Sequence, residues 1–91
     1  MLNFKPAFAI PPGETIMEFI DEGYIKKEEL IKKLDMSKTD FQSFVQGNIA
    51  ITKDIADKLE EALGVHFQFW LNLEKNYQKD KKRLDELARF L

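Results

Sequence analysis

The alternation of apolar and polar residues from about 12 to 64 predicts four short amphipathic helices. Within each stretch apolar residues recur every three or four positions, and residues typical of helix ends separate the stretches. Pro12-Gly13-Glu14 opens the first helix, because proline is tolerated in a first turn and an acidic side chain suits the positive end of the helix dipole. Gly23 is expected to end this helix, and Thr52 and Gly64 are expected to begin and end the fourth.

The second and third predicted helices, about 26–34 and 38–46, are close enough in the chain to form a helix-turn-helix. Asp35 stands in the turn between them, and aspartate is among the few residues besides glycine that tolerate a left-handed backbone. Ser37 is placed to cap the third helix. A buried apolar face would turn the polar first turn outward, as in a helix that reads the major groove. The residues of that apolar face are Phe41, Phe44 and Val45.

Polar residues on and around the third helix are the candidates for contact with double-stranded DNA. Gln42 could read an adenine through two hydrogen bonds, and Lys38 could contact guanine or phosphate. Asp40 would repel phosphate, although it could accept a hydrogen bond from a cytosine amino group. The predicted DNA-binding residues are Lys26, Lys27, Ser37, Lys38, Thr39, Gln42, Ser43, Gln46 and Asn48.

The stretch from about 67 to 90 predicts one long helix with a coiled-coil seam, in which Asp80 is the only polar member. At about 1.5 Å per residue such a helix is on the order of 35 Å long, more than a small body covers. We therefore expect a homodimer through this helix. There are two alternatives to a dimer. The end of the helix could be frayed, or a further domain could cover the same leucines. The predicted interface residues are Trp70, Leu73, Tyr77, Leu84, Leu87 and Leu91.

Residues 1–12 contain all three prolines and have no helical period, which predicts an extended arm. Phe4, Phe8 and Ile10 are expected to hold this arm against the body. The sequence thus predicts an all-α fold with five helices. Its expected divisions are an arm over 1–12, a helix-turn-helix domain over 13–78 and a C-terminal extension over 79–91.

Composition limits the classes of protein that this chain can be. Ninety-one residues with 44% hydrophobic content suit one small domain, and the absence of cysteine excludes disulfides and thiolate metal sites. No apolar run reaches the roughly 20 residues of a membrane span, and no signal peptide is evident, so we expect a cytoplasmic protein. The net charge of −2 disfavours nucleic-acid binding. Lysines nevertheless concentrate in the helix-turn-helix, which allows a basic face on an acidic protein.

No arrangement of residues indicates catalysis or a cofactor. His66 is the only histidine and has no spaced partner for a metal ion, so we interpret it as structural. Ser37 and Ser43 have no histidine to activate them, and no glycine-rich phosphate loop is present. We therefore expect neither an enzyme nor a metal site.

Three motifs together resemble a known family. They are Pro12-Gly13-Glu14, the helix-turn-helix from Glu29-Leu30 to Gln46-Gly47, and Phe69-Trp70-Leu71-Asn72-Leu73-Glu74 after Leu63-Gly64. This combination, over about residues 10–78, resembles the HigA-type antitoxins of the Xre (Cro/C1-like) family. The chain departs from the usual pattern at Ile31, where the family has alanine, and at Asp35, where it has a turn glycine.

The resemblance implies a five-helix repressor domain that binds its own promoter as a dimer, with a palindromic operator. It also implies a partner, a HigB-type toxin that is a RelE-like ribonuclease cleaving messenger RNA. The opening and the last helix are similar to a related group fused to an ImmA/IrrE-like metallopeptidase. This sequence has no HExxH motif, and both a natural short form and a fragment of a longer regulator are compatible with it.

A competing hypothesis is a protein-interaction or dimerisation module that kept the fold without sequence-specific DNA binding. The acidic pI of about 5.4 and Asp40 support this alternative, as does a last helix that is better specified than the DNA face. Many helical pairs bind no nucleic acid at all. A gel shift with the upstream region of the gene, with salt titrated, separates the two hypotheses.

Overall fold

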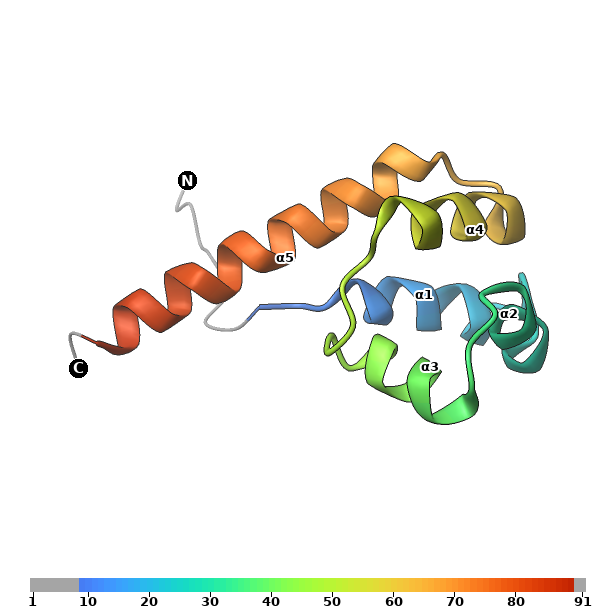
Figure 1. The fold of residues 1–91 in the computed structure, drawn as a ribbon, viewed down its shortest axis with the longest axis horizontal. Helices are drawn as coiled ribbons and strands as arrows, with labels where there is room; N and C mark the ends of the chain where they lie inside the picture. The colour runs from blue at the N-terminus through green and yellow to red at the C-terminus, as the bar shows by residue number, and fades with distance from the viewer. Residues whose placement is uncertain (1–8, 90–91) are drawn as a thin grey trace.

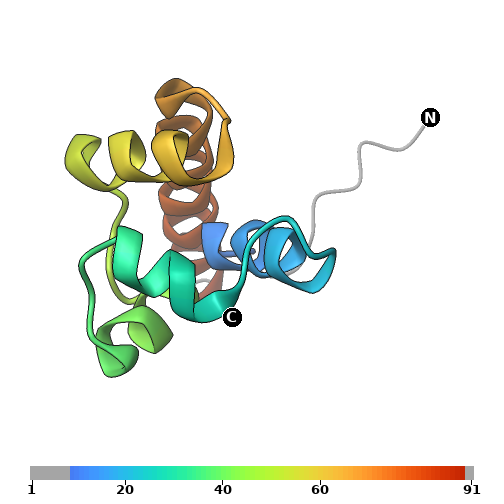
Figure 2. The same cartoon turned by 90° about the vertical axis from the view of Figure 1, so that its right-hand side faces the viewer.

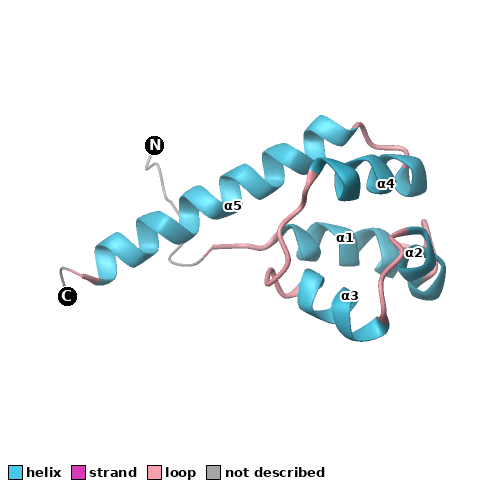
Figure 3. Ribbon diagram, viewed as in Figure 1, coloured by secondary structure: helices cyan, strands magenta, loops and turns pink. Residues whose placement is uncertain are grey.

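The computed structural model describes residues 9–89, and these residues form helices without any strand. Figure 1 and Figure 3 show the helices as a compact group from which the last helix extends. The all-α prediction is confirmed, with the predicted number of helices. The elements are α1 (Pro12–Asp21), α2 (Lys27–Lys33), α3 (Lys38–Val45), α4 (Lys53–Leu63) and α5 (Phe67–Ala88).

Local sequence signals account for the helix ends. The Ser37 hydroxyl accepts a hydrogen bond from the Asp40 amide at 3.0 Å, so it caps α3 as predicted. Thr52 caps α4 in the same way. Asp35 has a φ of 56°, and within the described residues it is the only residue other than glycine with a positive φ. The aspartate therefore forms the tight turn between α2 and α3, as predicted.

The core lies where α1 to α4 meet the first half of α5. Trp70 is fully buried at its centre, with its ring 5.9 Å from Phe19 and 5.0 Å from Phe69. Its indole N–H donates to the Val65 carbonyl at 3.1 Å, so burial leaves no polar atom of this side chain unpaired. The other large side chains that are almost fully buried are Ile16, Leu30, Leu34, Phe41, Phe44 and Leu59.

Two glycines allow α3 to pack closely against its neighbours. A Cβ on Gly13 would lie 2.1 Å from the Val45 carbonyl oxygen, so the start of α1 touches the backbone at the end of α3. Gly47 follows α3 with a φ of 89°, and a Cβ there would lie 2.5 Å from the Tyr77 hydroxyl of α5. The C-terminal end of α3 is thus held by α1 on one side and by α5 on another.

The position of α3 leaves one of its faces open. In Figure 1 and in the perpendicular view of Figure 2, α3 forms one edge of the body, and α4 lies at the opposite edge. Contacts with α1 support α3 from within. This arrangement exposes the outer face of the helix-turn-helix to solvent.

The last helix passes from the core into solvent. It covers 22 residues and extends past the other helices (Figure 1). Leu84 is half-buried and Leu87 is 54% exposed. The expected boundary between 78 and 79 falls inside α5, so it would mark a change of surroundings and no break in the helix.

The predicted arm lies mostly outside the described residues, as do Phe4, Phe8 and Leu91. Ile10 is described and is 47% exposed. In the part of the chain that the structure describes, no helix has the length and apolar character needed to span a bilayer.

Candidate nucleic-acid interface

The amphipathic pattern of α3 determines which of its side chains reach solvent. Phe41 and Phe44 are 1% and 2% exposed and anchor the helix in the core. Lys38, Thr39 and Gln42 are exposed on its other side, as the pattern predicted. Ser43, which was expected on the same exposed side, is half-buried. Val45, which was expected on the buried face, is also half-buried. The remaining predicted position on this helix end, Gln46, is exposed.

The elements beside α3 contribute the other predicted residues. Lys26 and Lys27 stand at the start of α2, and both are exposed. Ser37 is exposed while its hydroxyl caps α3. Asn48 is exposed after the end of α3, and its amide donates to the Ser43 carbonyl at 2.9 Å.

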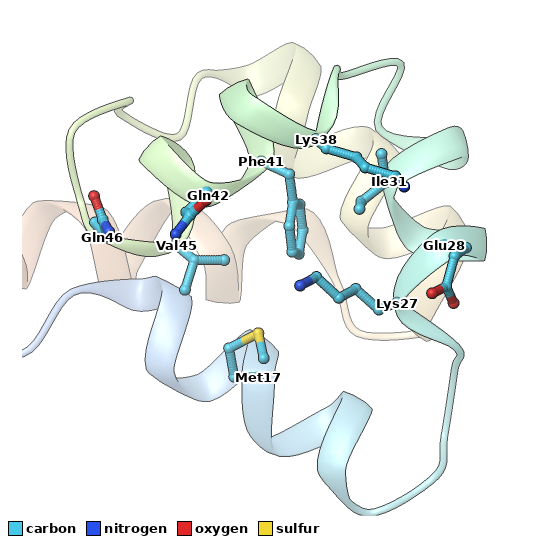
Figure 4. Close-up of a pocket in the computed structure, with 9 residues that line it drawn as sticks. All are labelled: Met17, Lys27, Glu28, Ile31, Lys38, Phe41, Gln42, Val45 and Gln46. Carbon is cyan, nitrogen blue, oxygen red and sulfur yellow. The ribbon is translucent and has the colours of Figure 1, made fainter.

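Four of these predicted residues come together around a groove between α1, α2 and α3, with a volume of about 480 Å³ (Figure 4). They are Lys27, Lys38, Gln42 and Gln46. Lys26, Ser37, Thr39, Ser43 and Asn48 do not line it. The predicted set is therefore divided between the groove and the surface around it.

Apolar side chains from three helices form the floor of this groove. Met17 comes from α1, Ile31 from α2, and Phe41 and Val45 from α3 (Figure 4). Sequence reasoning did not single out Met17, because it lies beside the inner stripe of α1 and nothing local shows which helix it faces. Ile31 is only 9% exposed, because the rest of its side chain packs in the core.

Within the described part of the chain, the lysines at the groove form no ion pair with an acidic residue. Ion pairs among residues 9–89 join Lys53 to Asp57, Lys58 to Asp54 and Arg83 to Asp80. None of them involves the helix-turn-helix. Lysines without an ion pair at an exposed surface remain available to an anionic partner such as a phosphate.

A buried carboxylate that sequence reasoning missed holds the loop after α3. Glu74 of α5 is 9% exposed, and its Oε1 accepts from the Ile51 amide at 2.8 Å. Its Oε2 accepts from the Gln78 side-chain amide. The helical spacing of Glu74 from Trp70 and Tyr77 was the signal that could have placed it inside. Its role is to fix the segment that links α3 to α4.

The structure gives His66 a structural contact. Its Nδ1 accepts a hydrogen bond from the Gln68 amide at 3.2 Å, so the imidazole caps α5. No group of three or more His, Cys, Asp or Glu residues that could hold a metal ion occurs within the described part of the chain.

No family model matches the sequence. Individual proteins with a similar sequence or structure are nevertheless known. The Escherichia coli protein YddM, an uncharacterised HTH-type transcriptional regulator, is 30% identical over 63 residues. The matched region covers 69% of this chain and 67% of YddM.

Three solved structures share the fold over nearly the whole chain. A candidate antidote protein of a plasmid maintenance system from Nostoc punctiforme has a TM-score of 0.78 and 29% identity, with 91% of each chain covered. Pseudomonas aeruginosa antitoxin HigA, solved with the higBA promoter, has a TM-score of 0.74 and 26% identity, with 90% of each chain covered. A HigA-family addiction module antidote protein from Coxiella burnetii has a TM-score of 0.70 and 26% identity, covering 92% of this chain and 96% of its own.

These relatives are regulators and antitoxins rather than enzymes, and they confirm the resemblance read from the sequence motifs. The chain belongs to the Xre-like helix-turn-helix transcriptional regulators, and its fold is similar to that of HigA-type antitoxins.

Proposed function

We propose that this protein represses transcription by binding a palindromic operator through α3, and that it is the antitoxin of a HigBA-type pair. The observation that carries the proposal is the two-sided character of α3. Two phenylalanines anchor it in the core while Lys38, Thr39 and Gln42 are exposed at the edge of the body. A helix anchored in this way can enter the major groove without disturbing the core.

Within this proposal the predicted residues divide by role. Gln42 reads an adenine, and Lys38 contacts guanine or phosphate. Lys27, at the start of α2, contacts the phosphate backbone and contributes no sequence preference. The surrounding predicted contacts complete the docking of the helix. They are Lys26, Ser37, Thr39, Ser43, Gln46 and Asn48.

A homodimer through α5 forms the second part of the proposal. The distal leucines Leu84 and Leu87 lie beyond the contacts that bury Trp70 and Tyr77 in the core. An isologous contact would cover these leucines on both chains at once. Two copies would then present two α3 helices to half-sites about one helical turn apart. In this proposal residues 13–78 form the DNA-binding domain and 79–91 the dimerisation extension.

The antitoxin role is inferred from similarity. The related Pseudomonas HigA was solved with the promoter of its own operon, higBA. By analogy, this chain represses the operon that encodes it and neutralises a RelE-like toxin. A neighbouring gene for a small basic RelE-like protein, and rescue of growth on co-expression, would test the toxin part.

Fluorescence anisotropy with the upstream DNA of its own gene tests the DNA part. We expect a specific complex whose affinity falls steeply with salt, because each phosphate contact releases counterions. Gln42→Ala should lower the affinity for the operator by about 1–3 kcal/mol and leave nonspecific binding unchanged. Lys27→Ala should weaken operator and unrelated DNA alike. No specific complex, or an unchanged affinity for both Gln42→Ala and Lys38→Ala, would refute this reading of α3.

The competing function is an interaction module that does not bind specific DNA. The net charge of −2 and the exposed Asp40 on α3 favour it, since both oppose phosphate. Such a module would dimerise through α5 yet show no preference between its own upstream DNA and unrelated DNA in the same anisotropy experiment.

A further inference from the structure

We propose that the groove between α1, α2 and α3 binds a small amphipathic anion, a molecule with a compact apolar body and one acidic group. The groove is a feature of the single chain and does not need DNA or a second copy to form. The effect that a bound ligand would have on the affinity for DNA rests on the proposed function.

The floor of the groove is apolar, and part of it is open to solvent. Phe41 is 1% exposed and Ile31 9%, so both are held by the core and offer a ligand little surface. The open apolar surface comes mainly from Met17 of α1 and Val45 of α3, which are half-buried. Burial of apolar surface of this kind by a ligand is favourable.

The rim of the groove carries more positive than negative charge. Two lysines, Lys27 and Lys38, and one acid, Glu28, line it, which gives a formal charge of +1. Figure 4 shows the Lys27 side chain extending into the space between Phe41 and Met17. Among residues 9–89 neither lysine belongs to an ion pair. An acidic group above the apolar floor would therefore meet the Lys27 ammonium, while Lys38 adds a second unpaired positive charge at the rim.

Size and lining together define the ligand class. The volume of about 480 Å³ falls within the roughly 300–1,000 Å³ typical of small-molecule sites. Such sites are mostly apolar and carry a few polar groups that orient the ligand. Here the side-chain amides of Gln42 and Gln46 supply neutral hydrogen-bonding groups on the side of the groove formed by α3 and its C-terminal end. A molecule of one to three rings, or a short branched chain, with a carboxylate or sulfonate fits this description.

Binding in the groove would oppose DNA binding. Four residues that line the groove also belong to the proposed DNA contacts. They are Lys27, Lys38, Gln42 and Gln46. A ligand that engages these side chains removes them from the operator, and linkage requires that the operator weaken the ligand by the same factor. The groove would then make repression responsive to a small anion.

The test uses two probes with the same ring system and different charge. The anionic probe is 8-anilinonaphthalene-1-sulfonate, and the neutral probe is N-phenyl-1-naphthylamine. In the absence of DNA we expect saturable fluorescence enhancement with one anion per chain, and weaker binding of the neutral probe by about fivefold.

Methyl NMR on the full chain gives the location of the bound probe. The sequence contains three methionines, so a sample labelled at the methionine methyl groups gives a simple spectrum. The Met17 methyl resonance should shift on titration with the anion. Met36 packs against the core and does not line the groove, so its resonance should shift much less.

Matched lysine variants test the charge requirement. Lys27→Gln with Lys38→Gln should weaken the anion about fivefold and leave the neutral probe unchanged. The control is Lys32→Gln with Lys33→Gln, because these exposed lysines of α2 do not line the groove and the change in net charge is the same. All four positions are exposed, so both variants should fold normally by circular dichroism.

Equal anion affinity of the two double variants, or an unmoved Met17 resonance at saturation, would overturn the proposal. A specific operator complex in a protein that binds no probe would refute this inference and leave the proposed function intact. Probe binding in the groove without any specific DNA complex would refute the proposed function and leave the site intact.

Discussion

The two halves of α5 carry the same helical pattern and reach opposite environments. In the proximal half, 67–77, Trp70 and Tyr77 are buried, and Glu74 is the one charged residue inside the core. In the distal half, 78–88, Leu87 is 54% exposed at a position of the same seam. The difference teaches that a seam of apolar residues marks a surface to be buried and does not say whether the same chain buries it.

The contacts of each half explain this difference. The proximal half packs on α4 and α1, and it touches the loop after α3 through Glu74 and Tyr77. The distal half extends past the other helices (Figure 1), and within it Arg83 lies 3.8 Å from Asp80. Lys81 also lies over the Tyr77 ring, with 5.2 Å between its Nζ and the ring centroid. Substitutions in the two halves should therefore have separable effects.

The largest effect on stability is expected from Trp70→Ala. This change empties the centre of the core, and removal of a large buried aromatic side chain typically costs about 3–5 kcal/mol. Urea unfolding followed by circular dichroism measures the loss. Leu87→Ala is the matched control on the same helix and should cost less than about 0.5 kcal/mol in dilute solution. A similar cost for both variants would remove the distinction between the two halves.

Gly47→Ala tests how the proximal half holds α3. The new methyl group would lie 2.5 Å from the Tyr77 hydroxyl, on a backbone with a φ of 89°. We expect a loss of about 2–3 kcal/mol in unfolding free energy from crowding and left-handed strain together. Gly23→Ala is the control, since Gly23 also has a positive φ but no atom lies within 4 Å of its added Cβ. If both variants lose the same stability, Tyr77 does not constrain the end of α3.

Glu74→Ala should remove about 1–3 kcal/mol of stability, because the buried Ile51 amide loses its acceptor. Glu74→Gln keeps an acceptor oxygen and should retain most of that stability. Hydrogen exchange at the Ile51 amide gives a local readout. It should accelerate in Glu74→Ala and change much less in Glu74→Gln. Exposed Glu61→Ala, on α4, is the control for loss of an acidic residue.

The smallest effect on domain stability, but the clearest effect on assembly, is expected from Leu84→Lys with Leu87→Lys. Neither leucine is fully buried in the single chain, so in dilute protein the free energy of unfolding should change by less than about 1 kcal/mol. Sedimentation at tens of micromolar should show a dimer for the natural chain and a monomer for the variant. A variant that dimerises as well as the natural chain would disprove an interface through the distal half.

Sequence alone determined the features that depend on neighbours in the chain. The Asp35 turn, the Ser37 and Thr52 caps and the stop at Gly64 all involve atoms within a few residues of each other. Backbone conformation and capping preferences act over that range, which is why these predictions were confirmed. The amphipathic pattern of α3 likewise indicated which side would be anchored, although it placed Val45 too deeply.

Tertiary structure decided the features that join residues far apart in the chain. Glu74 meets Ile51, Gly13 meets Val45, and Met17 faces α2 and α3 across the groove. Helical periodicity gives the direction of a side chain about its own axis, but it does not say which other helix lies in that direction. The packing of α1 and α5 against α3 supplies that information, and it alone determines where α5 leaves the core and where the apolar groove opens.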